Sequence, residues 1–452
     1  MGAAEQELRT PCAALLEAMN AHLFRALALA CVAGVLFAGC GVSRTQVSTA
    51  PWTLPNGIRV VLVPFPGSQD VSIFTYVPMG LASDPAGMTQ WAHLVEHLVI
   101  RVTHPEPSQE VNAETLPDHM RLDFYGTVNN WRKGLAYHAA WLSRGDFDDV
   151  SLRREIPLVL GECAFTARNL ATHKFAMAAW GQAFRHGRDR AAVKGDIERA
   201  TLDAVRQYYR EHFAVLNRTV VCIVGGVTLD EAHDAADGLL GAIKSEAASP
   251  APAATAKGDR EITWDLPTRH IVLSWPVPAP ADKDYAALYA AAAQLQMQLF
   301  QDDELKKLVG NVLVGADLAT PEGRYFYVNA VLQAGAEFKQ VQEAIETRLL
   351  ALETDSAAGQ APMIGGQLAY QLTHVMDPTL LKKQAPEMSS AMIEGNLGLQ
   401  WGMREFQFGP DRQALARNLS VVTRDNMQSA LKRYLAAERR LVVTIRPEES
   451  SQ

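Results

Sequence analysis

The stretch His93-Leu94-Val95-Glu96-His97 is the most informative part of this sequence. Apolar residues in and after it recur at the spacing of one buried helix face, which predicts a helix beginning near Thr89. His93 and His97 are four positions apart, so both imidazoles leave the same side of that helix. Two neutral ring nitrogens can then reach one metal ion at about 2.0–2.1 Å, the usual distance for zinc.

Glu96 adds a reactive group to this pair of histidines. It follows His93 by three positions and lies on the edge of the same helix face. A carboxylate there can take a proton from a water molecule beside the metal and pass a proton to a leaving amine. Because two histidines leave a catalytic zinc short of a third protein ligand, a carboxylate from a second helix is needed.

Two acidic residues later in the chain are candidates for that role. Glu155 and Glu162 lie seven positions apart, which is two helical turns, so both can face the same way. The run between them, IPLVLG, looks buried, and acids in a buried run need a compensating group such as a cation. Glu162 is the candidate third ligand. The alternative is a motif that arose by chance on a solvated helix face.

The order H-x-x-E-H, the reverse of the common zincin motif, resembles the inverzincins: pitrilysin, insulin-degrading enzyme and the mitochondrial processing peptidase. Residues 54–64, LPNGIRVVLVP, are similar to the opening strand of that family. Tyr208-Tyr209, followed by the strand predicted at 220–226, is similar to the end of the family's first domain.

This resemblance implies a zinc metalloendopeptidase, a hydrolase that cleaves small or extended peptides. It implies zinc ligation by His93, His97 and Glu162, catalysis by Glu96, and a helping acid at Glu155. It also implies that Gly126 and Asn129 lie on a strand bordering the cleft, with Asn129 in contact with substrate. The substrate is expected to add a strand to a sheet edge beside the metal.

The second half departs from the family pattern. Lys306 and Leu313 stand where active clefts of the family use an arginine and a tyrosine to grip the substrate carbonyl. Some bacterial members divide these roles between two subunits of similar size. The resemblance therefore implies a homologous partner subunit, or a homodimer, that completes the chamber. The alternative is a non-catalytic assembly or peptide-binding subunit with the same fold.

The order of predicted elements repeats along the chain. Each half has strands, helices and finally a late helix followed by a strand, here 219–224 in the first half and 440–445 in the second. Residues 245–259 are rich in Ala, Pro and Ser and read as a linker. We predict an α+β fold with two related domains, 51–244 and 260–447, each a mainly antiparallel sheet packed against helices.

The N-terminal region resembles an export signal. Residues 27–39 are apolar, too short to span a bilayer comfortably, and end in Phe-Ala-Gly before Cys40. This resembles a bacterial lipobox and predicts a signal peptide at 1–40, with lipid attachment at Cys40, a tether at 41–50, and a periplasmic protein anchored to a membrane. An ordinary cleaved signal and a core helix are the alternatives. Met19 is an alternative start to Met1, because the segment before it is acidic.

Net charge and cysteine spacing argue against several other classes of function. The formal net charge of -8 argues against nucleic acid as a partner. The five cysteines show no paired short spacing, so neither a Cys-rich zinc module nor a disulfide framework is indicated. Cys163 and Cys222 are expected to be two buried free thiols, although they could pair in an oxidising compartment. Because Cys163 directly follows Glu162, a helix would turn it about 100° away, into the core.

Overall fold

The computed structural model describes residues 51–169, 173–186, 194–246, 258–264, 267–320, 323–354, 359–375 and 377–447. They belong to one compact unit. The predicted signal peptide with Cys40, the tether at 41–50 and linker residues 247–257 lie outside the described residues. Among the helices that are described, none has the length and apolar character needed to cross a membrane.

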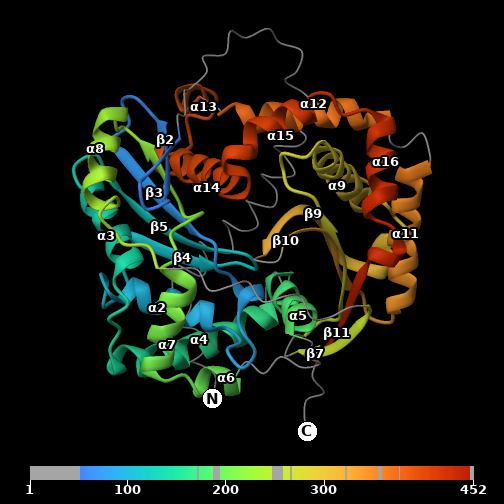
Figure 1. Cartoon of the computed structure of the whole chain (residues 1–452), viewed down its shortest axis with the longest axis horizontal. Coiled ribbons are helices and arrows are strands. Elements are labelled where there is room, and N and C mark those ends of the chain that lie inside the picture. Colours follow the sequence, from blue (N-terminus) through green and yellow to red (C-terminus); the bar gives the residue numbers. More distant parts are fainter. Residues whose placement is uncertain are drawn as a thin grey trace. The chain divides into compact units, whose positions relative to one another are not determined.

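Two β-sheets organise the chain (Figure 1). The first has the order β1-β2-β6-β3-β5-β4 and consists of β1 (Trp52–Thr53), β2 (Arg59–Pro64), β3 (Asp70–Val77), β4 (Val111–Thr115), β5 (Met120–Thr127) and β6 (Val220–Gly225). The second has the order β7-β11-β8-β10-β9 and consists of β7 (Arg260–Trp264), β8 (His270–Val277), β9 (Val309–Thr320), β10 (Gly323–Leu332) and β11 (Leu441–Pro447).

The two sheets share one topology once the short strand β1 is set aside. Each contains one parallel pair, β2 with β6 and β7 with β11. The other pairs are antiparallel. The prediction of an α+β fold with two related, mainly antiparallel sheets is therefore confirmed. The precise limits of the two domains stay a prediction.

Helices cover both sheets. In the first half they are α2 (Trp91–Arg101), α3 (Trp131–Ser143), α4 (Asp149–Asn169), α5 (His173–His186), α6 (Lys194–Glu198), α7 (Leu202–Tyr208) and α8 (Leu229–Leu239). In the second half they are α9 (Lys283–Gln301), α10 (Leu305–Leu308), α11 (Phe338–Thr354), α12 (Ala361–Thr373), α13 (Pro378–Gln384), α14 (Ser390–Phe408), α15 (Arg412–Leu419) and α16 (Arg424–Tyr434).

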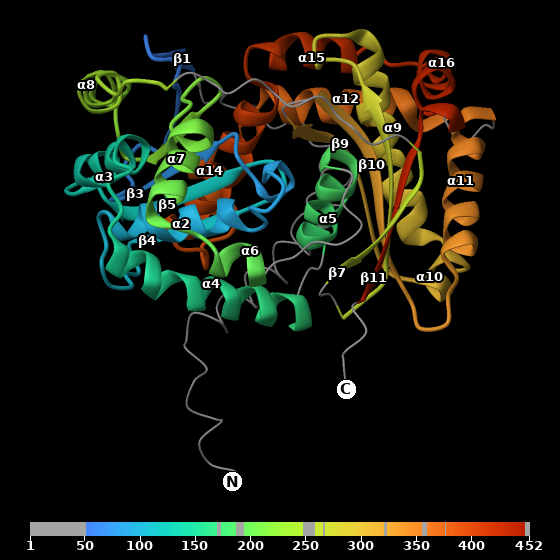
Figure 2. The same ribbon diagram turned by 60° about the horizontal axis from the view of Figure 1, so that its bottom comes forward.

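Each sheet receives one helix from the other half of the chain. Helix α14 packs on β3 and β6 of the first sheet, while α5 packs on β7, β8 and β11 of the second (Figure 2). This arrangement follows from strands that are apolar on both faces: in β2, Val60 and Leu62 belong to the core under α2, whereas Val61 and Val63 pack with α14. Both faces of the first sheet are therefore buried.

The start of α2 is held by buried acidic side chains. Asp84 accepts backbone hydrogen bonds from Gln90 at 2.8 Å and from Ala92 at 3.0 Å. Asp196 of α6 accepts the backbone N–H of Thr89 at 3.1 Å. These contacts satisfy donors that have no partner within the helix, and they place its first turn relative to the sheet. The residues of the H-x-x-E-H motif follow directly.

The predicted helix at 202–213 is continuous but changes its winding. Helix α7 passes into a π-turn over Tyr209–Phe213, in which the N–H of Ala214 donates to the carbonyl of Tyr209 at 2.9 Å. Such a turn inserts one extra residue, and its position depends on tertiary packing, so the apolar periodicity did not reveal it.

Candidate metal centre

Helices α2 and α4 bring three potential metal ligands together. The Nε2 atoms of His93 and His97 lie 3.3 Å and 3.5 Å from the same oxygen of Glu162. Both histidine side chains are mostly buried, whereas the Glu162 side chain is 59% exposed. Two imidazole nitrogens and a carboxylate oxygen thus converge from two helices, and these are the kinds of donor atom that catalytic zinc sites use.

Glu96 lies beside this group. One ligand atom each of His93, Glu96 and His97 fall within 4.8 Å of one another, so the three could also share an ion. The Glu96 carboxylate, however, is tied to a neighbouring strand: its Oε2 accepts a hydrogen bond from the hydroxyl of Thr115 at 2.5 Å. This bond holds Glu96 at the edge of the site through one of its two carboxylate oxygens.

The other ring nitrogen of each histidine also has a neighbour. Nδ1 of His97 lies 3.0 Å from Oε2 of Glu155, and the Glu155 side chain is fully buried. Oε1 of the same carboxylate accepts a hydrogen bond from Nε of Arg101 at 2.8 Å. Nδ1 of His93 lies 3.8 Å from the sulfur of Cys163. Contacts of this kind orient metal-binding imidazoles.

A positive charge, either a proton or a bound cation in its place, is favoured at the ring of His97. Burial alone would lower its pKa, but hydrogen bonds to Glu155 and Glu162 outweigh burial and raise the pKa to about 10. Burial likewise opposes ionisation of both acids, yet their histidine partners lower the pKa of Glu162 and lower that of Glu155 to about 2. Two ionised carboxylates thus surround the histidines, a charge balance that suits a bound cation.

The structure confirms some expectations about α4 and corrects others. Glu155 and Glu162 both face α2, as their spacing predicted. The expectation that the intervening run is buried is wrong in part, because Pro157, Leu158 and Gly161 are exposed, Leu158 by 45%. Helix α4 has one face at the surface, which leaves the candidate ligand accessible.

Asn129 does not lie on a strand beside the site. Strand β5 ends at Thr127, and Asn129 is an exposed residue of the turn that leads into α3. Its backbone N–H donates to the hydroxyl of Thr127 at 3.4 Å. The expected placement is therefore wrong, because the chain turns two residues earlier than assumed. A substrate contact by Asn129 stays a prediction.

The strand that does border the site is β4, which the sequence did not reveal. It forms an edge of the first sheet, pairs with β5 alone among the described strands, and ends at Thr115, the partner of Glu96. Its sequence VNAET has little apolar alternation. The sequence feature that could have indicated this strand is Thr115, a β-branched residue at the end of a short polar stretch between turn signals.

Lys306 and Leu313 lie apart from these ligands in the second half. Lys306, on α10, forms an ion pair with Asp303 at 2.8 Å. Leu313 belongs to β9 and pairs in register with Asn329. Neither has an interaction with the metal ligands among the contacts described.

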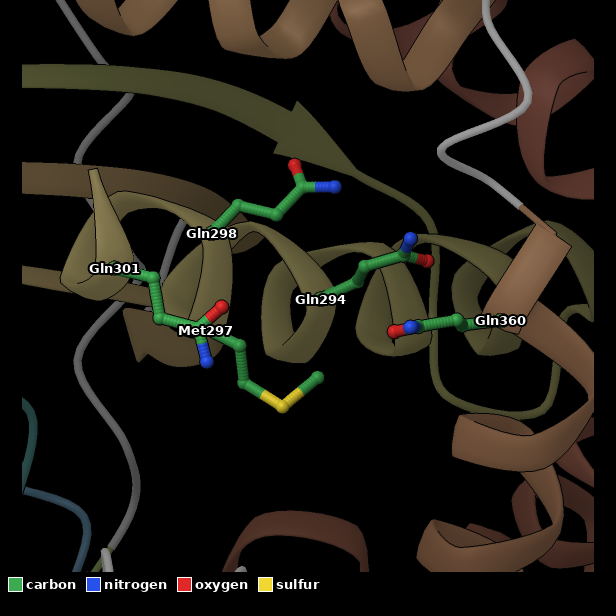
Figure 3. Close-up of a pocket in the computed structure, with 5 residues that line it drawn as sticks. All are labelled: Gln294, Met297, Gln298, Gln301 and Gln360. Carbon is green, nitrogen blue, oxygen red and sulfur yellow. The ribbon is translucent and has the colours of Figure 1, made fainter.

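Two hollows among the described residues are built differently from the metal site. One, of about 330 Å³, is lined by Gln294, Met297, Gln298 and Gln301 along α9, with Gln360 beside them (Figure 3). It contains no titratable side chain, so it cannot perform acid–base chemistry. A second, of about 640 Å³, is lined by polar and apolar residues near the end of the first half, including Arg206, Tyr209 and Glu246. Neither includes a residue of the H-x-x-E-H motif.

Both cysteines in the described part of the chain are buried thiols that form no disulfide there, as expected. The Ala-rich helix of the second half is also a packing element, since most alanines of α9 are buried.

Part of the sequence matches a known protein family, and the fold resembles solved structures. Residues 199–355 match the family model described as the peptidase M16 inactive domain. The matched segment begins after the histidines of α2 and the glutamates of α4, so its description does not cover the candidate metal ligands. No curated protein matches the chain.

Solved structures share the fold at low sequence identity. A protease from Helicobacter pylori is 18% identical, with a TM-score of 0.62, over 88% of this chain and 100% of that one. A peptidase M16 inactive domain from Pseudomonas fluorescens is 16% identical, with a TM-score of 0.61, over 90% of this chain and 99% of that one. Pitrilysin is 15% identical, with a TM-score of 0.58, over 91% of this chain but 46% of its own length.

The family match and the shared two-sheet fold agree with the resemblance carried by residues 93–97. Residues 199–355 therefore match a peptidase M16 domain, and the described chain has the fold of M16-like peptidases.

Proposed function

We propose that the chain is a zinc metalloendopeptidase in which His93, His97 and Glu162 hold the metal. The observation that carries the proposal is the convergence of both Nε2 atoms on one oxygen of Glu162. Zinc favours this mixture of two nitrogens and one oxygen with a further position left open. When bound, zinc would polarise a peptide carbonyl and make a neighbouring water more acidic.

The chain's own residues supply the proton transfers. Glu96 accepts the proton of the attacking water and delivers a proton to the amine nitrogen as the peptide bond breaks. Its hydrogen bond from Thr115 keeps one carboxylate oxygen fixed, so the other remains the basic atom. Glu155 stays ionised and holds His97 through Nδ1, which keeps Nε2 directed at the metal.

Strand β4 supports binding of an extended peptide. Its outer edge is unpaired within the described part of the sheet, and its last residue touches Glu96. A substrate strand added at this edge would run past the metal ligands while main-chain hydrogen bonds supply affinity. The side chains of the substrate would matter less than its extended conformation, which fits the cleavage of small or unfolded peptides.

A partner subunit is part of the proposal. Lys306 is bound to Asp303, and Leu313 is an apolar residue of β9, so neither offers the arginine and tyrosine of an active cleft. We propose that a homologous chain, or a second copy of this one, supplies these groups. We also propose that acylated Cys40 holds the protein at a membrane of the bacterial envelope. A fold relative, PqqL from Escherichia coli, is described as a periplasmic protease.

The proposal is tested by metal content and cleavage together. The full chain, purified without chelator and supplied with zinc, is expected to hold about one zinc per chain, and His97→Ala to lose it. Glu96→Gln should keep the zinc but lose cleavage of a quenched peptide library. If the unaltered chain does not bind zinc, the peptidase proposal is wrong.

The second candidate function is a non-catalytic peptide-binding or assembly subunit. The description of the matched family as inactive favours it. It predicts that zinc-loaded protein cleaves no peptide, alone or with a homologous partner, while still binding extended peptides. Ala113→Pro removes a backbone donor from the β4 edge. If peptide binding is lost in this variant, the binding role is supported.

A further inference from the structure

The two candidate metal-binding histidines are arranged in the same way. Each directs Nε2 toward Glu162, at 3.3 Å from His93 and 3.5 Å from His97. Each directs Nδ1 away from it, toward a residue of α4. For His97 that residue is Glu155, and for His93 it is Cys163.

Cys163 is well placed for such a contact. Its side chain is buried, and its sulfur lies 3.8 Å from Nδ1 of His93, within the range of a hydrogen bond to sulfur. The sulfur sits on the Nδ1 side of the ring, opposite the nitrogen that faces Glu162. It is therefore not positioned as a fourth ligand to the same ion.

The protonation of an imidazole links its two nitrogens. A neutral ring carries one proton, so Nε2 can bind a metal only when the proton is on Nδ1. An acceptor beside Nδ1 favours that form and fixes the ring plane. A thiol sulfur accepts hydrogen bonds, although more weakly than a carboxylate does.

We propose that Cys163 is a positioning residue for His93, corresponding to Glu155 for His97. Its sulfur accepts the Nδ1–H of His93 and so presents Nε2 to the metal. Helix α4 then supplies one ligand, Glu162, and the acceptors for both histidines of α2. The inference rests on the proposed zinc site and adds a residue to it.

The test compares matched cysteine variants of the full chain. Cys163→Ala removes the acceptor, and Cys163→Ser keeps one. Cys222→Ala is the control, because Cys222 is also a buried free thiol but lies on β6 against α14. Zinc affinity is measured by competition with a chelating dye. We expect Cys163→Ala to weaken binding about tenfold, the lower end of the effect of removing a partner of a metal-bound histidine. Cys163→Ser should recover part of the loss, and Cys222→Ala should match the unaltered protein.

Spectroscopy separates positioning from a packing effect. In zinc-loaded protein, the Nδ1–H proton of His93 should show a hydrogen-bonded NMR signal that shifts and exchanges faster in Cys163→Ala. The Nδ1–H of His97, held by Glu155, is the internal reference and should not change. In cobalt-loaded protein, we expect no thiolate-to-cobalt absorption band.

The possible outcomes are distinct. If the unaltered chain binds no zinc, the proposed function and this inference are both wrong. If it binds zinc and Cys163→Ala binds it equally well with an unchanged His93 signal, the zinc site stands and the positioning role is wrong. A thiolate–cobalt band would also overturn the inference, because Cys163 would then be a ligand.

Discussion

The carboxylate of Glu155 lies 3.0 Å from Nδ1 of His97 and is completely buried between α2 and α4. It also receives hydrogen bonds from Arg101 and Arg154. Burial would favour the neutral form, but the hydrogen bond with His97, and after it the one from Arg101, lowers the pKa of Glu155 and keeps the acid ionised. The orientation of His97 depends on that charge.

Replacing Glu155 with glutamine should therefore weaken zinc binding without removing a ligand. The amide has the same shape but loses the charge that favours a metal-directed Nε2, and we expect affinity to fall by about 10–100-fold. The zinc affinity of each variant is measured by competition with a chelating dye. Glu106→Gln is the control, since Glu106 is exposed and pairs only with Arg154 among the ion pairs described. Equal affinities for the two variants would contradict a supporting role for Glu155.

Glu394 predicts a specific dependence of stability on pH. Burial in α14, opposed by a hydrogen bond from Ser68 and reinforced by the charge of Asp70, raises its pKa to about 7. The folded protein thus holds a proton that the unfolded chain releases near pH 4.5. This contribution is full below that pH and is lost as the pH rises through about 7.

We expect the difference in unfolding free energy between the unaltered protein and Glu394→Gln to change by on the order of 2–3 kcal/mol across this window. Glutamine is neutral at every pH, so the variant should gain relative stability as pH rises. Urea unfolding at a series of pH values measures this. A difference that is independent of pH would show that Glu394 is not protonated in the folded state.

Gly398 permits the close approach of α14 to the first sheet. A Cβ atom at this position would lie 2.0 Å from the ring of Phe74, which is fully buried. Gly398→Ala should therefore destabilise the protein by about 2 kcal/mol or more, through overpacking. Gly366→Ala is the matched control, because Gly366 lies in α12 with open space around it, and alanine there should stabilise the helix by up to about 1 kcal/mol. Thermal unfolding of both variants tests the contrast; similar melting temperatures would refute it.

Gln90 adopts a left-handed backbone conformation at the residue before α2, with φ of 67°. Its buried amide has no hydrogen-bond partner among the described residues. Gln90→Gly should stabilise the protein by about 0.5–1 kcal/mol, because glycine adopts this conformation without a Cβ clash. Gln90→Ala removes the amide but retains the strained backbone. An alanine variant at least as stable as the glycine variant would show that backbone strain is not the dominant cost.

The residues of the site that share a helix were predictable, because their spacing in the sequence fixes their relative positions on that helix. A spacing of four between His93 and His97, and of seven between Glu155 and Glu162, has the same geometric meaning in any helix. The contact of Cys163 with His93 was not predictable, because it depends on how α2 and α4 cross. The helical rotation correctly placed Cys163 away from solvent, but rotation alone does not identify the neighbour on that side.

Other features depend on still longer-range contacts. The placement of α14 over β3 joins residues separated by more than half of the chain, and only glycines such as Gly398 hint at a close approach. Strand β4 was missed because an edge strand beside a polar site needs no apolar alternation. The family resemblance supplied the roles of the glutamates, but it also implied that Asn129 lies on a strand, whereas β5 ends two residues earlier, at Thr127.

The exchange of α5 and α14 has a consequence for protein synthesis. When a ribosome has produced only the first half, α5 has no second sheet to cover, and the β2, β3 and β6 face that α14 will bury is still open to water. The nascent chain must therefore leave the α14 surface open until about residue 408 has emerged, and the α5 surface incompletely covered until β11 has emerged at about residue 447. Neither half can reach its final packing early, so the protein is expected to depend on chaperones that shield growing chains, and to mature as a single unit once the last helices are made.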